Sequence, residues 1–302
     1  GDRAESEHDS PLMAAHFQDR LSRSRPDVVH FVHFMGLSAA PVDVCVGMGV
    51  PTVFTPTDFW IICPTVQLRL PDGRPCLGPD ATGVNCVRHL AQNVSHPTVA
   101  RLAGRLPDAV VAGLIRTATV LKRWERRYSP LVAAVAGRRA VLGTRMNRID
   151  RVLAPSRLME AMLVRHGLDP GRVQFLPYGI DLRVFTGGPS KQPSDRLRVG
   201  FIGTLADYKG PHVLCRAIKL LAPSVPVDAM LYGDPVAFPD YAAGLARLAA
   251  DEPRIHFCGT FPNSEIAAVL SRLDVLVVPS LWPESTPLVI SADTENDPDV
   301  LA

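Results

Sequence analysis

Short runs of β-branched and apolar residues alternate with helical stretches along almost all of this 302-residue chain, and this alternation constrains the fold most strongly. Four strands are expected in the first half, at residues 27–33, 51–55, 152–156 and 173–177. Four more are expected in the second half, at residues 197–202, 227–232, 255–258 and 275–279. Strands separated by helices pair in parallel, so each half is predicted to form an open parallel α/β sheet. Ligands of such sheets bind beyond the carboxyl ends of the strands.

The helices expected between these strands cover residues 37–49, 157–166, 211–221, 241–250 and 264–273. Ser156 is a candidate N-cap, and Gly167 is a candidate stop for the helix between them. Residues 99–143 have a helical pattern with few breaks. Residues 61–90 contain Pro, Gly and Cys without a regular period, which predicts a loop.

A change of composition at residues 186–195 predicts a linker, because Gly, Pro and Ser are frequent there and no hydrophobic period is present. The chain is therefore predicted to have an amino-terminal Rossmann-like domain, residues 1–187, and a carboxyl-terminal domain, residues 188–302. A chain of 302 residues is long enough to bury two separate cores.

Composition excludes several classes of protein. With 47% hydrophobic and 21% charged residues, the chain is expected to fold, and no apolar run is long enough to cross a bilayer. Residues 1–10 are acidic and polar, unlike a signal peptide, so a cytoplasmic location is expected. Six scattered cysteines do not suit a disulfide scaffold, and a net charge of +2 gives no signature of nucleic-acid binding.

Positive charge is concentrated in residues 101–151, where twelve Lys or Arg residues stand against three acidic ones. Two interpretations stay open. A solvated helix face is the commoner explanation of such charge, whereas an anionic membrane surface would suit an acceptor carried on a lipid.

A strand followed by a glycine turn, a lysine and a helix occurs in the segment that reads Val-Gly-Phe-Ile-Gly-Thr-Leu-Ala-Asp-Tyr-Lys-Gly-Pro, residues 199–211. The backbone at Gly203 can approach a phosphate, and Lys209 can add a full positive charge beside the start of the helix. Many loops of this kind are plain surface connections, so the segment predicts an anion site only together with other signals.

A second segment, residues 276–290, runs from a buried strand into a turn that carries Glu284. A carboxylate at this place could accept hydrogen bonds from the hydroxyls of a ribose or a sugar. The alternative is a glutamate that interacts with the dipole of the following helix.

These segments, "GTLADYKG" and "PSLWPESTPLVI", occur in order with "VLAPS", "FLPYGID" and "HFCG". Together they resemble the retaining GT-B glycosyltransferases of glycosyltransferase family 4, also called glycosyl transferases group 1. The resemblance extends from about residue 26 to residue 290. It implies an α/β GT-B architecture, with two Rossmann-like domains facing a cleft. It also implies that strands before this chain and helices after it are missing.

The resemblance implies roles for individual residues. Lys209 matches the lysine that contacts the donor diphosphate, and Glu284 matches the first glutamate of an E-x7-E motif whose second position is Ala292 here. Asp58, just past the strand at residues 51–55, is the third catalytic candidate, although Thr57 stands where relatives often have histidine. The implied donor-binding residues are Gly203, Thr204, Lys209, Glu284, Ser285, Thr286 and Pro287.

Two histidines precede Asp58 in the sequence. We interpret His30 and His33 as strand residues rather than catalysts.

Three cysteines and a histidine, Cys63, Cys76, Cys86 and His89, have the spacing C-x12-C-x9-C-x2-H. The short final spacing suits a tetrahedral zinc site, and some relatives carry similar cysteine-bearing loops. A structural zinc and a loop of incidental thiols are the two alternatives.

The expected function is transfer of a hexose from a nucleoside diphosphate sugar to a glycan, lipid-linked or other acceptor, with retention of configuration and no required cofactor. The expected location is cytoplasmic, with association at the inner face of the membrane as an option. The alternatives are a catalytically inactive binding relative and a nucleotide-sugar epimerase.

Overall fold

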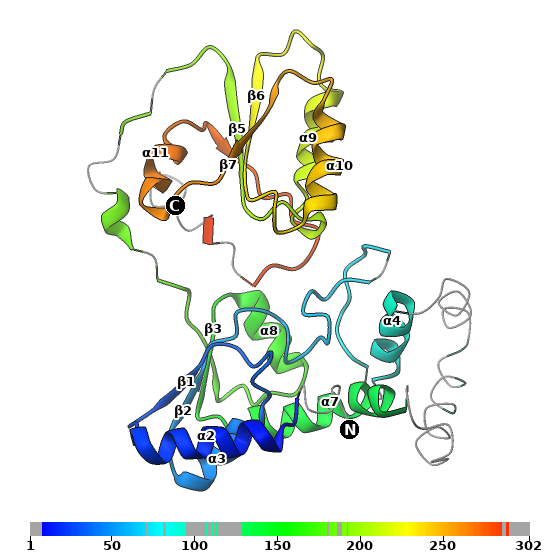
Figure 1. The fold of residues 1–302 in the computed structure, drawn as a ribbon, viewed down its shortest axis with the longest axis vertical. Coiled ribbons are helices and arrows are strands. Elements are labelled where there is room, and N and C mark those ends of the chain that lie inside the picture. Colours follow the sequence, from blue (N-terminus) through cyan, green and yellow to red (C-terminus); the bar gives the residue numbers. More distant parts are fainter. Residues whose placement is uncertain are drawn as a thin grey trace. The chain divides into compact units, whose positions relative to one another are not determined.

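The computed structural model describes residues 8–70, 72–80, 83–94, 107, 110, 113, 129–179, 181–185, 189–191, 193–285 and 288–289. The chain divides into two compact units, Gly1–Pro177 and Tyr178–Ala302 (Figure 1). The residues predicted to form a linker, 186–195, therefore fall in the second unit.

The first unit contains a four-stranded parallel sheet in the order β1-β2-β3-β4. Its strands are Val29–Phe31, Thr52–Phe54, Arg151–Ala154 and Val173–Phe175. Each lies inside or within one residue of a predicted strand. The carboxyl ends of β1 and β2 are neighbours, because Phe31 pairs with Phe54.

The helices of this unit are α2 (Pro11–Ser24), α3 (Ala40–Met48), α4 (Val84–Val94), α7 (Ser129–Met146) and α8 (Arg157–Arg165). A cluster of aromatic side chains lies in the core. The centre of the Phe34 ring is 4.9 Å from the centre of the Phe31 ring and 4.8 Å from that of the Phe54 ring. Most of the predicted helical region 99–143 before α7 lies outside the described residues.

Two of these helices, α2 and α4, were not predicted. α2 buries Leu21 alone, so it has no strong apolar stripe to give the 3.6-residue period. A start signal was nevertheless present, because Ser10 accepts a hydrogen bond from the Met13 N–H at 3.3 Å and Pro11 opens the helix. The same device was recognised at α8, where the Ser156 hydroxyl caps the Met159 N–H at 3.2 Å.

The second unit contains a parallel sheet in the order β7-β6-β5-β8, of which Figure 1 labels β5, β6 and β7. Its strands are β5 (Leu197–Ile202), β6 (Val227–Tyr232), β7 (Ile255–Gly259) and β8 (Val275–Leu276). The helices are α9 (Pro211–Leu220), α10 (Pro239–Ala249) and α11 (Ile266–Leu270), with short 3-10 turns at η1 (Leu182–Phe185), η2 (Asp207–Lys209) and η3 (Asn263–Glu265). α11 and β8 are shorter than predicted and the 3-10 turns were not predicted, but the other elements follow the predicted order and type closely.

The strand order decides which loops meet. β8 is the last strand in the sequence, yet it pairs with β5, with Val199 opposite Val275 and Gly200 opposite Leu276. The segments that follow β5 and β8 therefore leave the sheet side by side, at the edge where ligands of parallel sheets bind.

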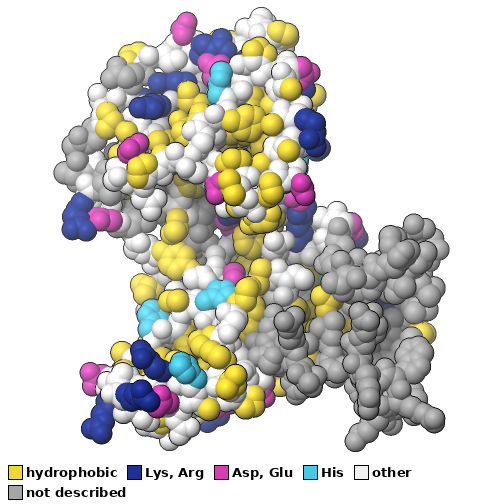
Figure 2. Space-filling view, in the orientation of Figure 1, with side chains coloured by type: hydrophobic (Ala, Val, Ile, Leu, Met, Phe, Trp, Pro, Cys, Tyr) yellow, Lys and Arg dark blue, Asp and Glu magenta, His cyan; other side chains and the backbone are white. Residues whose placement is uncertain are grey.

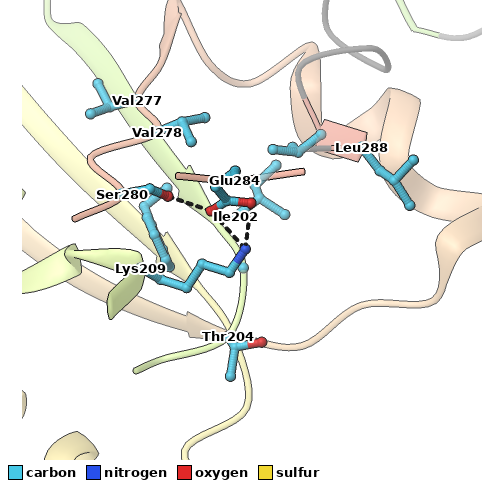
Figure 3. A pocket seen from close by; sticks show the side chains of 11 residues that line it. Ile202, Thr204, Lys209, Val277, Val278, Ser280, Glu284 and Leu288 are labelled. Carbon is cyan, nitrogen blue, oxygen red and sulfur yellow. Dashed lines mark hydrogen bonds and ion pairs between the residues drawn. The ribbon is translucent and has the colours of Figure 1, made fainter. Parts of the chain in front are cut away.

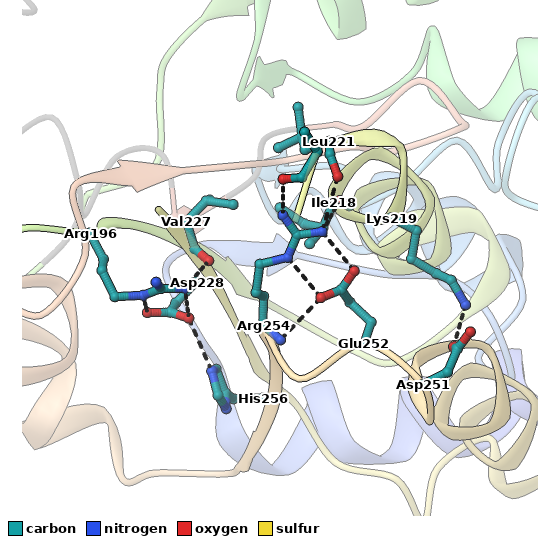
Figure 4. A network of polar contacts seen from close by, with 11 residues as sticks. Arg196, Ile218, Lys219, Leu221, Val227, Asp228, Asp251, Glu252, Arg254 and His256 are labelled. Atoms are coloured by element: carbon teal, nitrogen blue, oxygen red, sulfur yellow. Dashed lines mark hydrogen bonds and ion pairs between the residues drawn. The ribbon is translucent and has the colours of Figure 1, made fainter. Parts of the chain in front are cut away.

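A buried arginine, Arg254, caps the carboxyl end of α9 in this unit (Figure 4). The Arg254 guanidinium donates to the carbonyls of Ile218 at 3.0 Å and Leu221 at 3.2 Å at the carboxyl end of the helix, where the Ile218 carbonyl also accepts the Leu221 N–H at 3.1 Å. Glu252 holds the same guanidinium with two contacts of 2.7 Å, and this pairing lowers the pKa of Glu252 to about 2.

Lys and Arg side chains are interspersed with Asp and Glu over the described surface of the face in Figure 2. Among the residues that the structure describes, every helix is too short or too polar to cross a bilayer.

Candidate functional site

A pocket of about 270 Å³ lies at the carboxyl ends of β5 and β8 in the second unit. The turn after β5, η2 and the segment after β8 supply its walls (Figure 3). It is lined by Phe201, Ile202, Gly203, Thr204, Lys209, Val277, Val278, Ser280, Glu284, Leu288 and Val289.

Lys209 and Glu284 face each other in this pocket. The Lys209 Nζ atom lies 2.7 Å from Oε1 and 2.8 Å from Oε2 of Glu284, although the two residues are 75 positions apart. Their side chains are 25% and 11% exposed, so the pair is mostly shielded from water but reachable from the pocket. A cation and a carboxylate side by side can bind a ligand that offers both an anion and hydroxyl groups.

Two further donors hold Glu284, and neither was singled out in the sequence. The Ser280 hydroxyl donates to Oε1, and the Trp282 indole N–H donates to the same oxygen at 3.3 Å. The tetrapeptide that precedes Glu284 contains both residues, but no local pattern indicates that a serine and an indole will turn back onto the carboxylate.

The loop that carries Glu284 docks closely on η2. Gly210 has a φ of 73°, and a Cβ atom there would overlap the carbonyl oxygen of Pro279. Leu281 donates its backbone N–H to the Tyr208 carbonyl at 2.8 Å. Glycine at position 210 therefore permits both a left-handed backbone and the close approach of the two loops.

The other predicted donor-binding residues have mixed outcomes. Gly203 and Thr204 line the pocket, whereas Ser285 is buried and is absent from its lining. Thr286, Pro287 and Ala292 lie outside the described residues.

Asp58 lies in the first unit, just past the carboxyl end of β2. Its Oδ2 atom is 2.7 Å from His33 Nε2, and its Oδ1 accepts the Trp60 N–H at 2.8 Å. The His33 Nδ1 atom accepts the Met35 N–H at 2.8 Å, so Nε2 carries the hydrogen that is donated to Asp58.

The interpretation of His33 as a strand residue is wrong, because β1 ends at Phe31 and the His33 side chain turns to Asp58. His30 does lie in β1, and its Nε2 atom is 2.8 Å from the Thr55 hydroxyl. The sequence could have indicated this contact, because His33 and Asp58 each follow a strand within a few residues, and parallel neighbouring strands end at the same edge of the sheet.

The cysteine loop does not form a metal site among the described residues, where no group of three or more His, Cys, Asp or Glu side chains could hold an ion. Cys76 Sγ and His89 Nδ1 are 4.0 Å apart. Burial raises the pKa of Cys86 to about 12 and lowers that of His89. A zinc ion bound by Cys63, Cys76, Cys86 and His89 remains a prediction from the sequence.

The carboxyl-terminal part of the chain matches a known protein family. Residues 196–292 match the family model described as glycosyl transferases group 1. The D-inositol 3-phosphate glycosyltransferase of Mycobacterium bovis (strain BCG / Pasteur 1173P2) is 32% identical over 135 residues, which are 41% of this chain and 27% of that protein. The protein of the same description from Corynebacterium glutamicum (strain R) is 26% identical over 160 residues, 48% of this chain and 38% of that protein.

Solved structures match over nearly the whole chain. Anabaena Alr3699/HepE in complex with UDP-glucose has a TM-score of 0.57 at 16% identity, covering 94% of this chain and 61% of that one. A glycosyltransferase from Rickettsia africae ESF-5 has a TM-score of 0.56 at 13% identity, covering 94% of this chain and 59% of that one. The two parallel-sheet units therefore have the GT-B fold, and the chain spans less than two thirds of the length of these relatives.

Proposed function

We propose that this chain, whose residues 196–292 belong to the glycosyl transferases group 1, transfers a hexose from a nucleoside diphosphate sugar to an acceptor with retention of configuration. The observation that carries the proposal is the Lys209–Glu284 pair in the pocket beyond β5 and β8. Anabaena Alr3699/HepE, which shares the fold, was solved with UDP-glucose.

Lys209 is the residue that meets the donor diphosphate. An ammonium is a compact charge that suits phosphate oxygens, and the glycine turn at Gly203 leaves room for them. In the structure the ammonium is neutralised by Glu284, at 2.7 and 2.8 Å. When the donor binds, its diphosphate takes the place of Glu284 beside Lys209. The ammonium therefore has an anionic partner both with and without the donor.

Glu284 is the residue that accepts hydrogen bonds from hydroxyls of the donor sugar. A carboxylate that is 11% exposed binds a hydroxyl more strongly than one in bulk water, because few water molecules compete for it.

The chemical step needs charge stabilisation rather than a protein nucleophile. As the bond from the sugar to the diphosphate breaks, negative charge grows on the leaving phosphate. Lys209 stabilises that charge more than it stabilises the intact donor, which lowers the barrier. No cofactor enters this scheme.

Asp58, held by His33 and the Trp60 N–H, is the candidate in the first unit for binding a hydroxyl of the acceptor or the sugar. The acceptor class that we propose is a glycan or a lipid-linked glycan. Of the twelve Lys and Arg residues at 101–151, Arg138 is buried and Arg145 and Arg148 pair with Asp43. The others support a membrane surface as the place where such an acceptor is met. Cosedimentation with vesicles containing anionic lipid, compared with neutral vesicles, tests this; equal binding to both would remove the suggestion.

Calorimetric titration with UDP and with GDP tests the donor site. One nucleotide is expected to bind, and Lys209→Ala should weaken its binding about 10- to 100-fold, the value of one charge-assisted contact. Lys219→Ala is the matched control, because Lys219 lies on α9 and pairs with Asp251 away from the pocket. The Lys219→Ala variant should bind the nucleotide with the affinity of the wild type.

Incubation with UDP-glucose or GDP-mannose, followed by release of the nucleotide, tests the chemistry. Slow hydrolysis without acceptor, abolished by Lys209→Ala, supports a transferase. Tight binding without any turnover in the presence of acceptors would instead support an inactive binding relative, and binding of neither nucleotide would contradict the donor site itself.

A further inference from the structure

The two oxygens of Glu284 are occupied unequally. Oε1 accepts hydrogen bonds from the Ser280 hydroxyl, from the Trp282 indole at 3.3 Å and from Lys209 at 2.7 Å. Oε2 accepts from Lys209 at 2.8 Å. Both neutral donors therefore converge on one oxygen, and the other oxygen depends on the lysine.

Trp282 is in contact with both members of the ion pair. Its indole N–H reaches Glu284, and the Lys209 ammonium lies 5.6 Å from the centre of its ring. The ring also packs edge-on against Tyr208, with 5.4 Å between the ring centres and an angle of 75°. An indole that is fixed on one side by an aromatic edge presents its single N–H in a constant direction.

We propose that Trp282, together with Ser280, is a positioning residue that holds Glu284 by Oε1 and so presents Oε2 to a hydroxyl of the donor sugar. The inference rests on the proposed function and deepens it, because it assigns residues that decide whether the site recognises the sugar in addition to the nucleotide.

The anchors of Glu284 become important when Lys209 turns to the diphosphate. The carboxylate then loses its contacts of 2.7 and 2.8 Å to the ammonium. Without other donors the Glu284 carboxylate would be free to rotate. Ordering it again when the sugar binds would cost conformational entropy and so reduce the affinity for the sugar. With the Ser280 and Trp282 donors retained on Oε1, rotation is prevented and Oε2 is left with an open lone pair.

The affinity for the free nucleotide and the affinity for the nucleotide sugar should respond differently to substitutions in the site. Lys209 contributes to the binding of the nucleotide diphosphate and of the complete nucleotide sugar. Glu284 contributes only when the sugar is present. A loss of its anchors should therefore lower the affinity for the nucleotide sugar and leave the affinity for the free nucleotide unchanged.

The test compares the dissociation constants of UDP with UDP-glucose, and of GDP with GDP-mannose, for the wild type and for Trp282→Phe. Phenylalanine keeps an aromatic ring against Tyr208 and Lys209 but has no N–H. The expected result is a nucleotide-sugar affinity that is about 5- to 10-fold weaker, with nucleotide affinity within about twofold of the wild type. Ser280→Ala, which removes the second anchor, should produce the same split.

Ser271→Ala is the matched control for the loss of a hydroxyl. Ser271 follows α11 in the second unit and donates its hydroxyl to the Ala268 carbonyl at 2.9 Å, outside the lining of the pocket. This variant should change neither the affinity for the nucleotide nor that for the nucleotide sugar. Thermal unfolding of each variant shows whether it is folded.

The outcomes are distinct. If Trp282→Phe and Ser280→Ala both keep the wild-type ratio of the two affinities, or weaken both ligands equally, the positioning role is overturned while the donor site stands. If the wild type binds none of the four ligands, the proposed function fails, and the inference fails with it.

Discussion

The ends of the two sheets carry similar pairs in different surroundings. In the second unit, Lys209 meets Glu284 at the carboxyl ends of β5 and β8, and in the first unit His33 meets Asp58 at the carboxyl ends of β1 and β2. The first of these pairs lines a pocket of about 270 Å³, whereas the cavity beside Asp58 is about 10 Å³. Each carboxylate is oriented by at least two donors.

The ligand site at Lys209 and Glu284 in the second unit is therefore more fully formed than the site at Asp58 in the first unit. The second unit by itself combines a cation, a held carboxylate and a cavity, which is a complete binding arrangement for a ligand. In the first unit the oriented carboxylate of Asp58 lies beside a cavity of only about 10 Å³, and the cavity of about 390 Å³ in that unit lies elsewhere, beside Asp43 and Arg145. We therefore expect substitutions in the second unit to act on donor binding, and substitutions at Asp58 to act on turnover.

The largest effect is expected for Glu284→Ala. The change removes the hydroxyl acceptor and leaves the Lys209 ammonium without its carboxylate, so kcat/KM should fall about 10²- to 10³-fold. Steady-state kinetics with the nucleotide sugar that the chain binds would measure it. A loss smaller than that of Asp58→Asn would break the comparison, since the unit with the formed pocket would then contribute less.

The next effect is expected for Asp58→Asn, for which we predict a fall in kcat of about 10- to 100-fold and an unchanged affinity for the nucleotide. An amide keeps the size of the carboxylate but loses its charge. Nucleotide affinity is measured by calorimetry and kcat by nucleotide release. A changed nucleotide affinity would show that the two carboxylates do not have separate roles.

His33 sharpens the same prediction, because its Nε2 donates to Asp58 at 2.7 Å. His33→Gln retains a side-chain donor and should keep more activity than His33→Ala, with kcat rather than nucleotide affinity affected. Equal activities of the two variants would leave no role for the hydrogen bond.

A structural prediction concerns the close approach of the loops around the pocket. Gly210→Ala adds a Cβ atom at a φ of 73° against the Pro279 carbonyl, so it should destabilise the protein by about 1–3 kcal/mol and weaken nucleotide binding. Gly137→Ala in α7 of the first unit is the matched control, because a Cβ there meets nothing within 4 Å. It should stabilise by about 0.5–1 kcal/mol in denaturant unfolding. A stable Gly210→Ala variant would mean that the loops are not packed as described.

The smallest effect is expected in the pH dependence of the second unit. The Arg254 guanidinium lowers the pKa of Glu252 to about 2, below the value of about 4.3 expected in the unfolded chain. Because the folded pKa is the lower one, this contribution to stability is complete above pH of about 4.3 and is lost as the pH falls toward 2. Thermal unfolding between pH 7 and pH 3 should show a shallower decline for Glu252→Gln than for the wild type, while identical slopes would contradict the assignment.

Much of the second unit could be predicted from the sequence, because its strands are short, mostly apolar runs bounded by turn residues. The strand at residues 197–202 was predicted with the ends it has, and Lys209 follows it as expected. The first unit was harder. α2 buries only Leu21, and its main signal is the cap formed by Ser10. Such a signal is local and small, and hydrophobic periodicity does not detect it.

The side-chain partners in the site could not be predicted in the same way. His33 was interpreted as a strand residue, because its position relative to Asp58 depends on where β1 ends and on how the chain turns after Phe31. Ser280 and Trp282 were not identified, because their donation to Glu284 depends on the path of a loop without regular structure.

The α/β class, the order of the strands along the chain and the lysine and glutamate that follow two of them can all be predicted from the amino-acid sequence. These features follow from local periodicity and turn residues, which act over a few positions. The tertiary structure alone decided that Lys209 and Glu284 are partners across 75 positions. The physical reason is that β8 pairs with β5, and which strands pair depends on how the helices and strands of the whole unit bury their apolar faces together, not on either segment alone.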